Sequence, residues 1–144
     1  MSILVRVRIR LDYKGLQKPG KFFFGGKDTE EVAEETREQQ VNMLRNVPLQ
    51  GITIEEVDMS GDVYSVYDEL VNAQVAYAPV VLTVRADGLE DVVRFIARDE
   101  FRKVEVLEPE CIEMNKTDIE RILFRVSEEY RGYRILLERK YNSR

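Results

Sequence analysis

Apolar and charged residues alternate strictly near the start of the chain, over residues 5–12. Every second position is apolar, and the positions between them include Arg6, Arg8 and Arg10. Side chains with a period of two point to opposite faces of a β-strand. The pattern therefore predicts a strand with one apolar face and one charged face.

Four later segments have the apolar spacing of helices. Residues 28–46 begin with Asp28-Thr29-Glu30-Glu31, which resembles a capping box, and residues 87–96 begin with a similar Asp-x-x-Glu sequence. Residues 117–132 begin with Thr-x-x-Glu, and Gly132 is predicted to end that helix. A short helix is preferred over 62–74, although the same apolar residues could form a strand.

Strands are predicted over 52–57, 79–84, 104–106 and 133–141, so strands and helices alternate along the whole chain. Such alternation is typical of a three-layer α/β fold. However, only residues 80–84 are continuously apolar, as a strand buried on both faces would be. Burying the three arginines of the first strand without partners would also be very costly. We therefore expect an α+β fold, a two-layer sandwich of ferredoxin-like arrangement with about five strands and three to four helices. The three-layer fold is the alternative.

A single domain over residues 1–144 is expected from the length of the chain. Its two halves, 1–77 and 78–144, run through similar elements, so duplication of one half is an alternative origin. Residues 81–93, with Asp87-Gly88-Leu89 at their centre, resemble the strand–turn–helix opening of ACT-type regulatory domains. In that family the turn helps to form small-ligand sites between paired domains. This resemblance implies an ACT-like form of the ferredoxin-like arrangement.

The composition excludes several kinds of chemistry. The chain has no histidine and a single cysteine, Cys111. Histidine-dependent catalytic triads, histidine metal sites and an intrachain disulfide framework are therefore excluded. We expect no metal, no cofactor, a reducing cytoplasm and no membrane span. The high share of charged residues, 34%, leans towards a thermophilic source.

The most unusual segment is the loop over residues 14–28, which contains four lysines, four glycines and three consecutive phenylalanines. It leads into a predicted helix start, where free backbone N–H groups favour anions. Residues 1–27 carry seven basic side chains and one acidic one, whereas residues 28–77 carry two and twelve. The loop is therefore a candidate anion-binding site formed by Lys18, Gly20, Lys21, Gly25, Gly26 and Lys27. The preferred alternative is a β-hairpin or extended strand in which Phe22 and Phe24 pack inward and the lysines keep the loop soluble.

The leading functional hypothesis is a non-catalytic binding or interaction module that self-associates, with a dimer favoured. Its interface is predicted on the open sheet face, at Arg6, Arg8, Arg10, Phe22 and Phe24. The alternative is a regulatory domain that senses an anionic small molecule or nucleotide at the loop. An enzyme using carboxylate or lysine chemistry is the weakest reading.

Two further expectations concern the charged strand. Its arginines are predicted to pair across the sheet with Glu55, Glu105 or Glu138. Nucleic acid is disfavoured as a partner because the net charge of the chain is −5.

Overall fold

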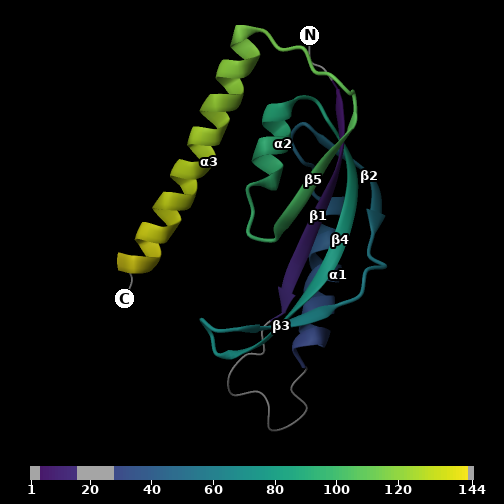
Figure 1. The fold of residues 1–144 in the computed structure, drawn as a ribbon, viewed down its shortest axis with the longest axis vertical. Coiled ribbons are helices and arrows are strands. Elements are labelled where there is room, and N and C mark those ends of the chain that lie inside the picture. Colours follow the sequence, from purple (N-terminus) through teal and green to yellow (C-terminus); the bar gives the residue numbers. More distant parts are fainter. Residues whose placement is uncertain (1–3, 16–27, 143–144) are drawn as a thin grey trace.

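Two long neighbouring strands, β1 (Val5–Gly15) and β4 (Ala73–Ala86), form the centre of the sheet. The structure is a computed structural model, and it describes residues 4–15 and 28–142. The remaining elements are α1 (Thr29–Asn46), β2 (Ile52–Asp58), β3 (Tyr64–Asp68), α2 (Leu89–Ile96), β5 (Phe101–Glu108) and α3 (Lys116–Asn142). Figure 1 shows these elements along the chain.

All strand pairs of the five-stranded sheet are antiparallel. The main order is β2-β4-β1-β5, and β3 pairs with the first part of β4, at the end away from β2. The long β4 thus contacts three other strands. This mixed α+β sheet with three helices in the described residues agrees with the predicted class and with the expected strand number.

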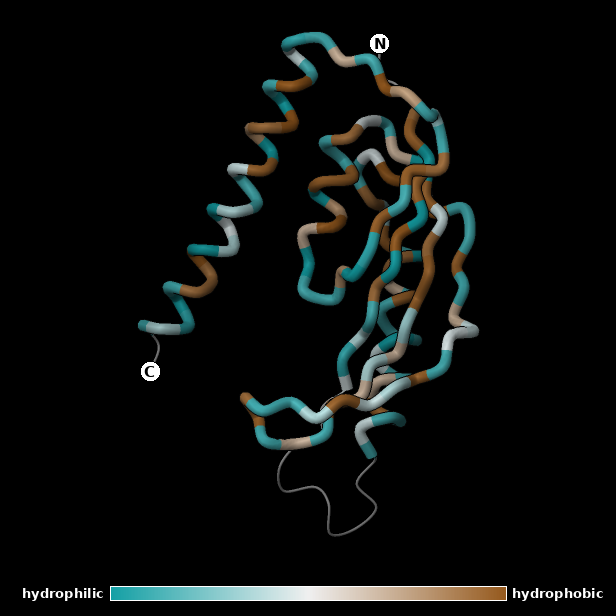
Figure 2. The backbone as a smooth tube through the Cα atoms, in the orientation of Figure 1, coloured by the Kyte–Doolittle hydropathy of each residue, from teal (hydrophilic) through white to brown (hydrophobic). Residues whose placement is uncertain are grey.

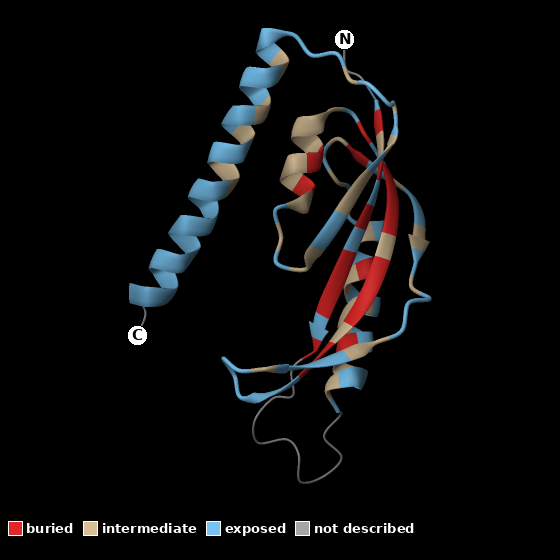
Figure 3. Cartoon of the chain, viewed as in Figure 1, coloured by how far each residue is buried: buried red, intermediate tan, exposed pale blue. Residues whose placement is uncertain are grey.

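The apolar side of the alternating pattern forms the core. In the β1–β4 register Val7 faces Val84 and Ile9 faces Leu82, and all four side chains are fully buried. Buried residues of α1 and α2 belong to the same cluster. Full burial of one such aliphatic side chain stabilises a fold by about 1.5–3 kcal/mol. The two helices therefore cover one face of the sheet, which gives two layers. Figure 3 shows the buried residues concentrated along β1 and β4.

The other face of the sheet carries the charged residues and no described helix packs on it. Arg6 and Arg8 lie there beside carboxylates of the neighbouring strands β2 and β5. Two predicted pairings are confirmed, because Arg6 contacts Glu55 and Arg8 contacts Glu105. The third predicted acid, Glu138, lies on α3 instead.

Two predicted elements are wrong. Residues 64–68 form strand β3 and not a helix, because the hydrogen bonds of β4 extend beyond the apolar run and pair with this segment. Residues 133–141 are helical and not a strand. The helix α3 passes through Gly132 without stopping, because nothing at that position imposes a left-handed turn.

The helix starts differ in detail from their predictions. Asp28 caps α1 as expected, since its Oδ1 accepts a hydrogen bond of 2.8 Å from the backbone N–H of Glu31. The box that starts α3 lies two residues earlier than predicted, where Asn115 and Asp118 each accept a hydrogen bond from the other's backbone N–H. Gly88, which has no side chain to accept a bond, is the cap of α2.

The last helix leaves the body of the protein. In Figure 1, α3 runs beside α2 and then away from the sheet. None of its residues is buried, and α2 is its main contact. Apolar residues recur along its length (Figure 2). Among the described residues, no helix combines the length and apolar character needed to cross a membrane.

Candidate functional site

A buried carboxylate, Asp12, organises the charged face near the end of β1. Its side chain is 2% exposed. The Oδ1 atom accepts a 2.9 Å bond from Arg10 Nε, and Oδ2 accepts bonds from Arg10 Nη2 at 3.2 Å and from the Tyr64 hydroxyl at 2.5 Å. Arg102 Nε lies 3.6 Å from the same Oδ2. One carboxylate therefore connects side chains of three strands, β1, β3 and β5.

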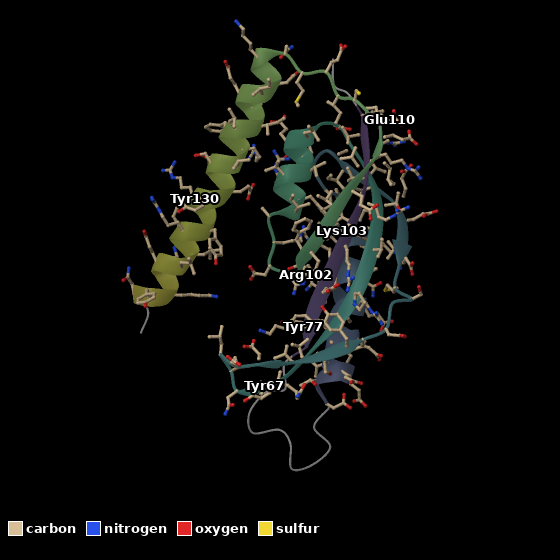
Figure 4. All side chains as sticks on the ribbon, viewed as in Figure 1. Tyr67, Tyr77, Arg102, Lys103, Glu110 and Tyr130 are labelled. Carbon is tan, nitrogen blue, oxygen red and sulfur yellow. The ribbon has the colours of Figure 1, made fainter. Side chains whose placement is uncertain are left out.

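Two tyrosine rings and Arg102 cover this carboxylate. Tyr64 stacks on Tyr77 with 5.4 Å between ring centroids, and the Arg102 guanidinium lies 5.3 Å from the Tyr77 ring centroid. Figure 4 shows Tyr77 and Arg102 together on the sheet. Burial raises the pKa of Tyr64, and its bond to Asp12 raises it further. The hydroxyl therefore stays protonated at neutral pH and acts as a hydrogen-bond donor.

A polar groove of about 520 Å³ lies beside this cluster, at the end of β1. Its lining includes Tyr13, Lys14, Gln40, Glu100 and Arg102. Both cations and carboxylates line it, so it offers hydrogen-bond donors and acceptors together.

The hydroxyl of Tyr13 is buried in the wall of this groove. It has no hydrogen-bond partner among the described residues. Burial raises the pKa of Tyr13 to about 12, the charge of Glu100 adds to this, and Arg98 opposes it. A buried hydroxyl without a hydrogen-bond partner lowers the stability of a fold by about 1–3 kcal/mol. The Tyr13 hydroxyl is therefore expected to destabilise this part of the core.

The predicted interface arginines lie together on the open face, but they are engaged by neighbouring acids. Arg6 Nε is 2.8 Å from Glu55 Oε1, and its hydrogen bond to Glu55 is the main reason that the pKa of Arg6 is raised. Arg8 Nη1 is 3.6 Å from Glu105 Oε2. The central part of this face therefore carries charged side chains that pair with one another across the strands.

The rest of the predicted site lies outside the described residues. This applies to the candidate interface residues Phe22 and Phe24. It applies also to the whole candidate anion site, formed by Lys18, Gly20, Lys21, Gly25, Gly26 and Lys27. The Asp28 carboxylate occupies the helix start that was expected to favour an anion. Any anion there would meet this negative charge.

Exposed apolar side chains form a continuous stripe along α3. The sequence analysis did not predict the full length of this stripe. Its members recur every three or four residues, and each is between 44% and 83% exposed. They are Ile119, Leu123, Val126, Tyr130, Tyr133, Leu137 and Tyr141. Residues at this spacing lie on one side of a helix. We call this set the α3 stripe.

The stripe is distinct from the side of α3 that faces the body. Ile122, next to it around the helix, lies with Leu89 in the small crevice between the starts of α2 and α3. Tyr130, within the stripe, is far from Tyr77 and Arg102 on the sheet (Figure 4). The pattern of the stripe was visible in the sequence as far as Tyr130. The second half of the stripe was not predicted, because residues 133–141 were expected to form a strand.

A second exposed apolar surface lies at the turn between β3 and β4. Leu70 is 96% exposed there, and Tyr67 and Val71 are also exposed. The backbone of this hairpin projects from the body (Figure 1). It is smaller than the α3 stripe.

The described residues offer no group of three acidic or thiol side chains that could hold a metal ion. Comparison of the chain with protein-family models, curated proteins and solved structures finds no match.

Proposed function

We propose that this protein is a non-catalytic interaction module that self-associates through α3. The single observation that carries the proposal is the α3 stripe: seven apolar side chains exposed along a helix of 27 residues. Apolar surface that recurs on one side of a projecting helix gains free energy when a partner covers it. The interface therefore lies on α3 in this proposal, and the arginine face of the sheet stays open to solvent.

Two features favour binding over catalysis. Both oxygens of Asp12 already accept hydrogen bonds, which leaves this carboxylate poorly placed to take a proton from a substrate. The tyrosines near it have raised pKa values and remain neutral at physiological pH. A rigid, satisfied network of this kind stabilises a scaffold.

The scaffold itself supports the expected ferredoxin-like arrangement. Without the short β3 and the appended α3, the remaining elements run strand–helix–strand–strand–helix–strand, which is the split βαβ pattern. The order β2-β4-β1-β5, antiparallel throughout, fits that pattern. The final helix is then an addition to a complete domain, available for contacts between copies.

Sedimentation velocity at micromolar concentration tests the proposal. We expect the wild-type protein to sediment as a dimer and Leu123→Glu to sediment as a monomer. Phe124→Glu is the matched control, because both side chains are 63% exposed but Phe124 lies outside the stripe. A monomeric wild type, or equal effects of the two substitutions, would contradict the proposal.

A second candidate function is the binding of an anionic small molecule in the groove beside Tyr13. It is supported by two cationic side chains on the lining, Lys14 and Arg102. The carboxylates on the same wall favour a ligand that also carries a hydrogen-bond donor.

Thermal-shift screening with phosphorylated metabolites tests this second candidate. A binding compound should raise the melting temperature of the wild type and have less effect on Lys14→Ala. Lys103→Ala is a suitable control, because Lys103 is exposed and pairs with Glu105 instead of lining the groove. No stabilisation by any compound, or equal stabilisation of all three proteins, would remove this candidate.

A further inference from the structure

We propose that the partner of α3 is α3 of a second copy, in antiparallel orientation, with the two helices crossing near residue 128. The inference rests on the proposed self-association and adds the identity, direction and register of the partner. It is argued from the spacing, the sizes and the charges of the side chains on α3.

The spacing of the stripe is that of a coiled coil. From Ile119 to Leu137 the apolar positions are separated alternately by four and three residues, which is the heptad pattern of the two core positions. At about 1.5 Å per residue, α3 is roughly 40 Å long. Such a helix offers more than two full heptads to a partner of equal length.

The sizes of the core side chains favour the antiparallel direction. With the centre near residue 128, Val126 faces Tyr130 of the second copy, Leu123 faces Tyr133, and Ile119 faces Leu137. Tyr130 and Tyr133 then each meet an aliphatic side chain, so large and small residues fill these layers together. Tyr141 faces Asn115, the residue before α3, and lies outside the core layers. In a parallel pair each residue would face itself, and three layers, at Tyr130, Tyr133 and Tyr141, would contain only tyrosine.

The charges of the two halves of α3 favour the same direction. Residues 116–129 carry three basic and four acidic side chains, whereas residues 130–142 carry four basic and one acidic. An antiparallel pair places the acidic half of each helix against the basic half of the other. A parallel pair would place the two basic halves together, at a cost in Coulomb repulsion.

Residues beside the core agree with this register. Glu120 faces Arg134 of the second copy on one flank, and by symmetry this pair occurs twice. The other flank borders the side of α3 that faces α2, where Ile122 lies with Leu89. On this flank Glu129 lies opposite Glu129 of the second copy. Arg125 of the same helix lies 4.0 Å from the Glu129 carboxylate and offsets its charge.

Disulfide cross-linking of the full-length chain tests direction and register together. The background is Cys111→Ser, because Cys111 is exposed and would react. In that background Ser127→Cys should oxidise to a covalent dimer of doubled mass on a non-reducing gel, since residue 127 lies beside its own copy at the centre. Glu120→Cys and Arg134→Cys should each stay monomeric alone and should form a mixed dimer when combined.

Leu137→Cys distinguishes the parallel alternative, because residue 137 faces itself only in a parallel pair. Cross-linking of Leu137→Cys to itself, without cross-linking of Ser127→Cys, would overturn the antiparallel pairing while self-association stands. Failure of every variant to cross-link, with a wild type that sediments as a dimer, would place the interface elsewhere and also overturn it. A monomeric wild type would instead remove the proposed function itself.

Discussion

A single carboxylate illustrates how much one residue contributes to this fold. Asp12 is almost fully buried, yet its partners Arg10 and Arg102 remain partly exposed. Water can therefore rehydrate the two guanidinium groups if the carboxylate charge is removed, which limits the cost of losing it. The tyrosine hydroxyl on Oδ2 has less freedom to find another partner.

Replacement of Asp12 by Asn is expected to lower the free energy of unfolding by about 1–3 kcal/mol. The amide keeps the shape of the side chain but loses its charge and one acceptor. The control is Glu105→Gln, whose exposed pair with Arg8 should contribute less than about 1 kcal/mol. Urea unfolding followed by circular dichroism measures both, and equal losses would mean that Asp12 is not central.

A second residue-scale prediction concerns stability at high pH. The pKa of Tyr13 is raised to about 12 in the folded protein from an ordinary value of 10. Below pH 10 the hydroxyl is neutral in both states, and the stabilising effect is complete. As the pH rises from 10 to 12 the unfolded chain ionises first, so the free energy of unfolding should fall.

The loss should reach about 2–3 kcal/mol, at about 1.4 kcal/mol per pKa unit. Tyr13→Phe has no hydroxyl to ionise, and its stability should decline less over this range. At neutral pH it should be at least as stable as the wild type, because the hydroxyl lacks a partner among the described residues. Denaturant unfolding at pH 8, 10 and 11.5 compares the two proteins. Parallel curves would show that Tyr13 ionises normally.

At this scale the sequence predicts contacts that follow from the alternation of side chains along one strand. Alternation along β1 was enough to expect the charged face and the pairing of its arginines with acids such as Glu55 and Glu105. The Asp12–Tyr64 bond could not be expected, because it depends on a pairing of β3 with β4 that competes with a helical pattern in the same residues.

At the scale of elements, two glycines show the difference between the local preference of a residue and the packing around it. Gly132 was predicted to end the last helix because glycine is common just after the ends of helices. In the structure α3 continues through it. Gly15 is the opposite case. It lies where the end of β1 meets α1, and a Cβ built on it would be 2.3 Å from the backbone nitrogen of Ala33.

Alanine at these two glycines should therefore have effects of opposite sign. Gly15→Ala should destabilise the protein by about 1–3 kcal/mol or more, because backbone atoms must move to admit the methyl group. Gly132→Ala should stabilise it by about 0.5–1 kcal/mol, because nothing lies within 4 Å and alanine is the better helix former. Thermal melts of both variants decide this. Destabilisation by Gly132→Ala would contradict the continuous helix.

The error over residues 133–141 also has a physical cause. Ile135, Leu136 and Leu137 form a short apolar run, which fits a strand locally, whereas their neighbours on a helix lie in the preceding turns. Extending the three- and four-residue spacing of Leu123 and Val126 past Gly132 would have placed them on the helix. The composition of a short segment alone does not distinguish a strand from a helix.

At the scale of the whole molecule, the proposed self-association through the α3 stripe predicts that stability depends on protein concentration. If two copies cover each other's stripe, dissociation accompanies unfolding, and mass action raises the melting temperature as protein concentration rises. The wild type should show this rise over a hundredfold range of concentration, whereas Leu123→Glu should not. Differential scanning calorimetry measures both. A wild-type melting temperature that is constant over this range would argue for a monomer.

The pairing of β1 with β4 also determines how the chain reaches its fold. The central strands of the sheet are separated by the loop, α1, β2 and β3, so the core cannot close until residues far apart in sequence meet. Closing such a long segment costs chain entropy before any contact repays it. Folding of this domain should therefore be slow for its size, in the millisecond-to-second range of non-local β topologies. Helix α3, whose contacts are mostly local, can form well before the sheet to which it is attached.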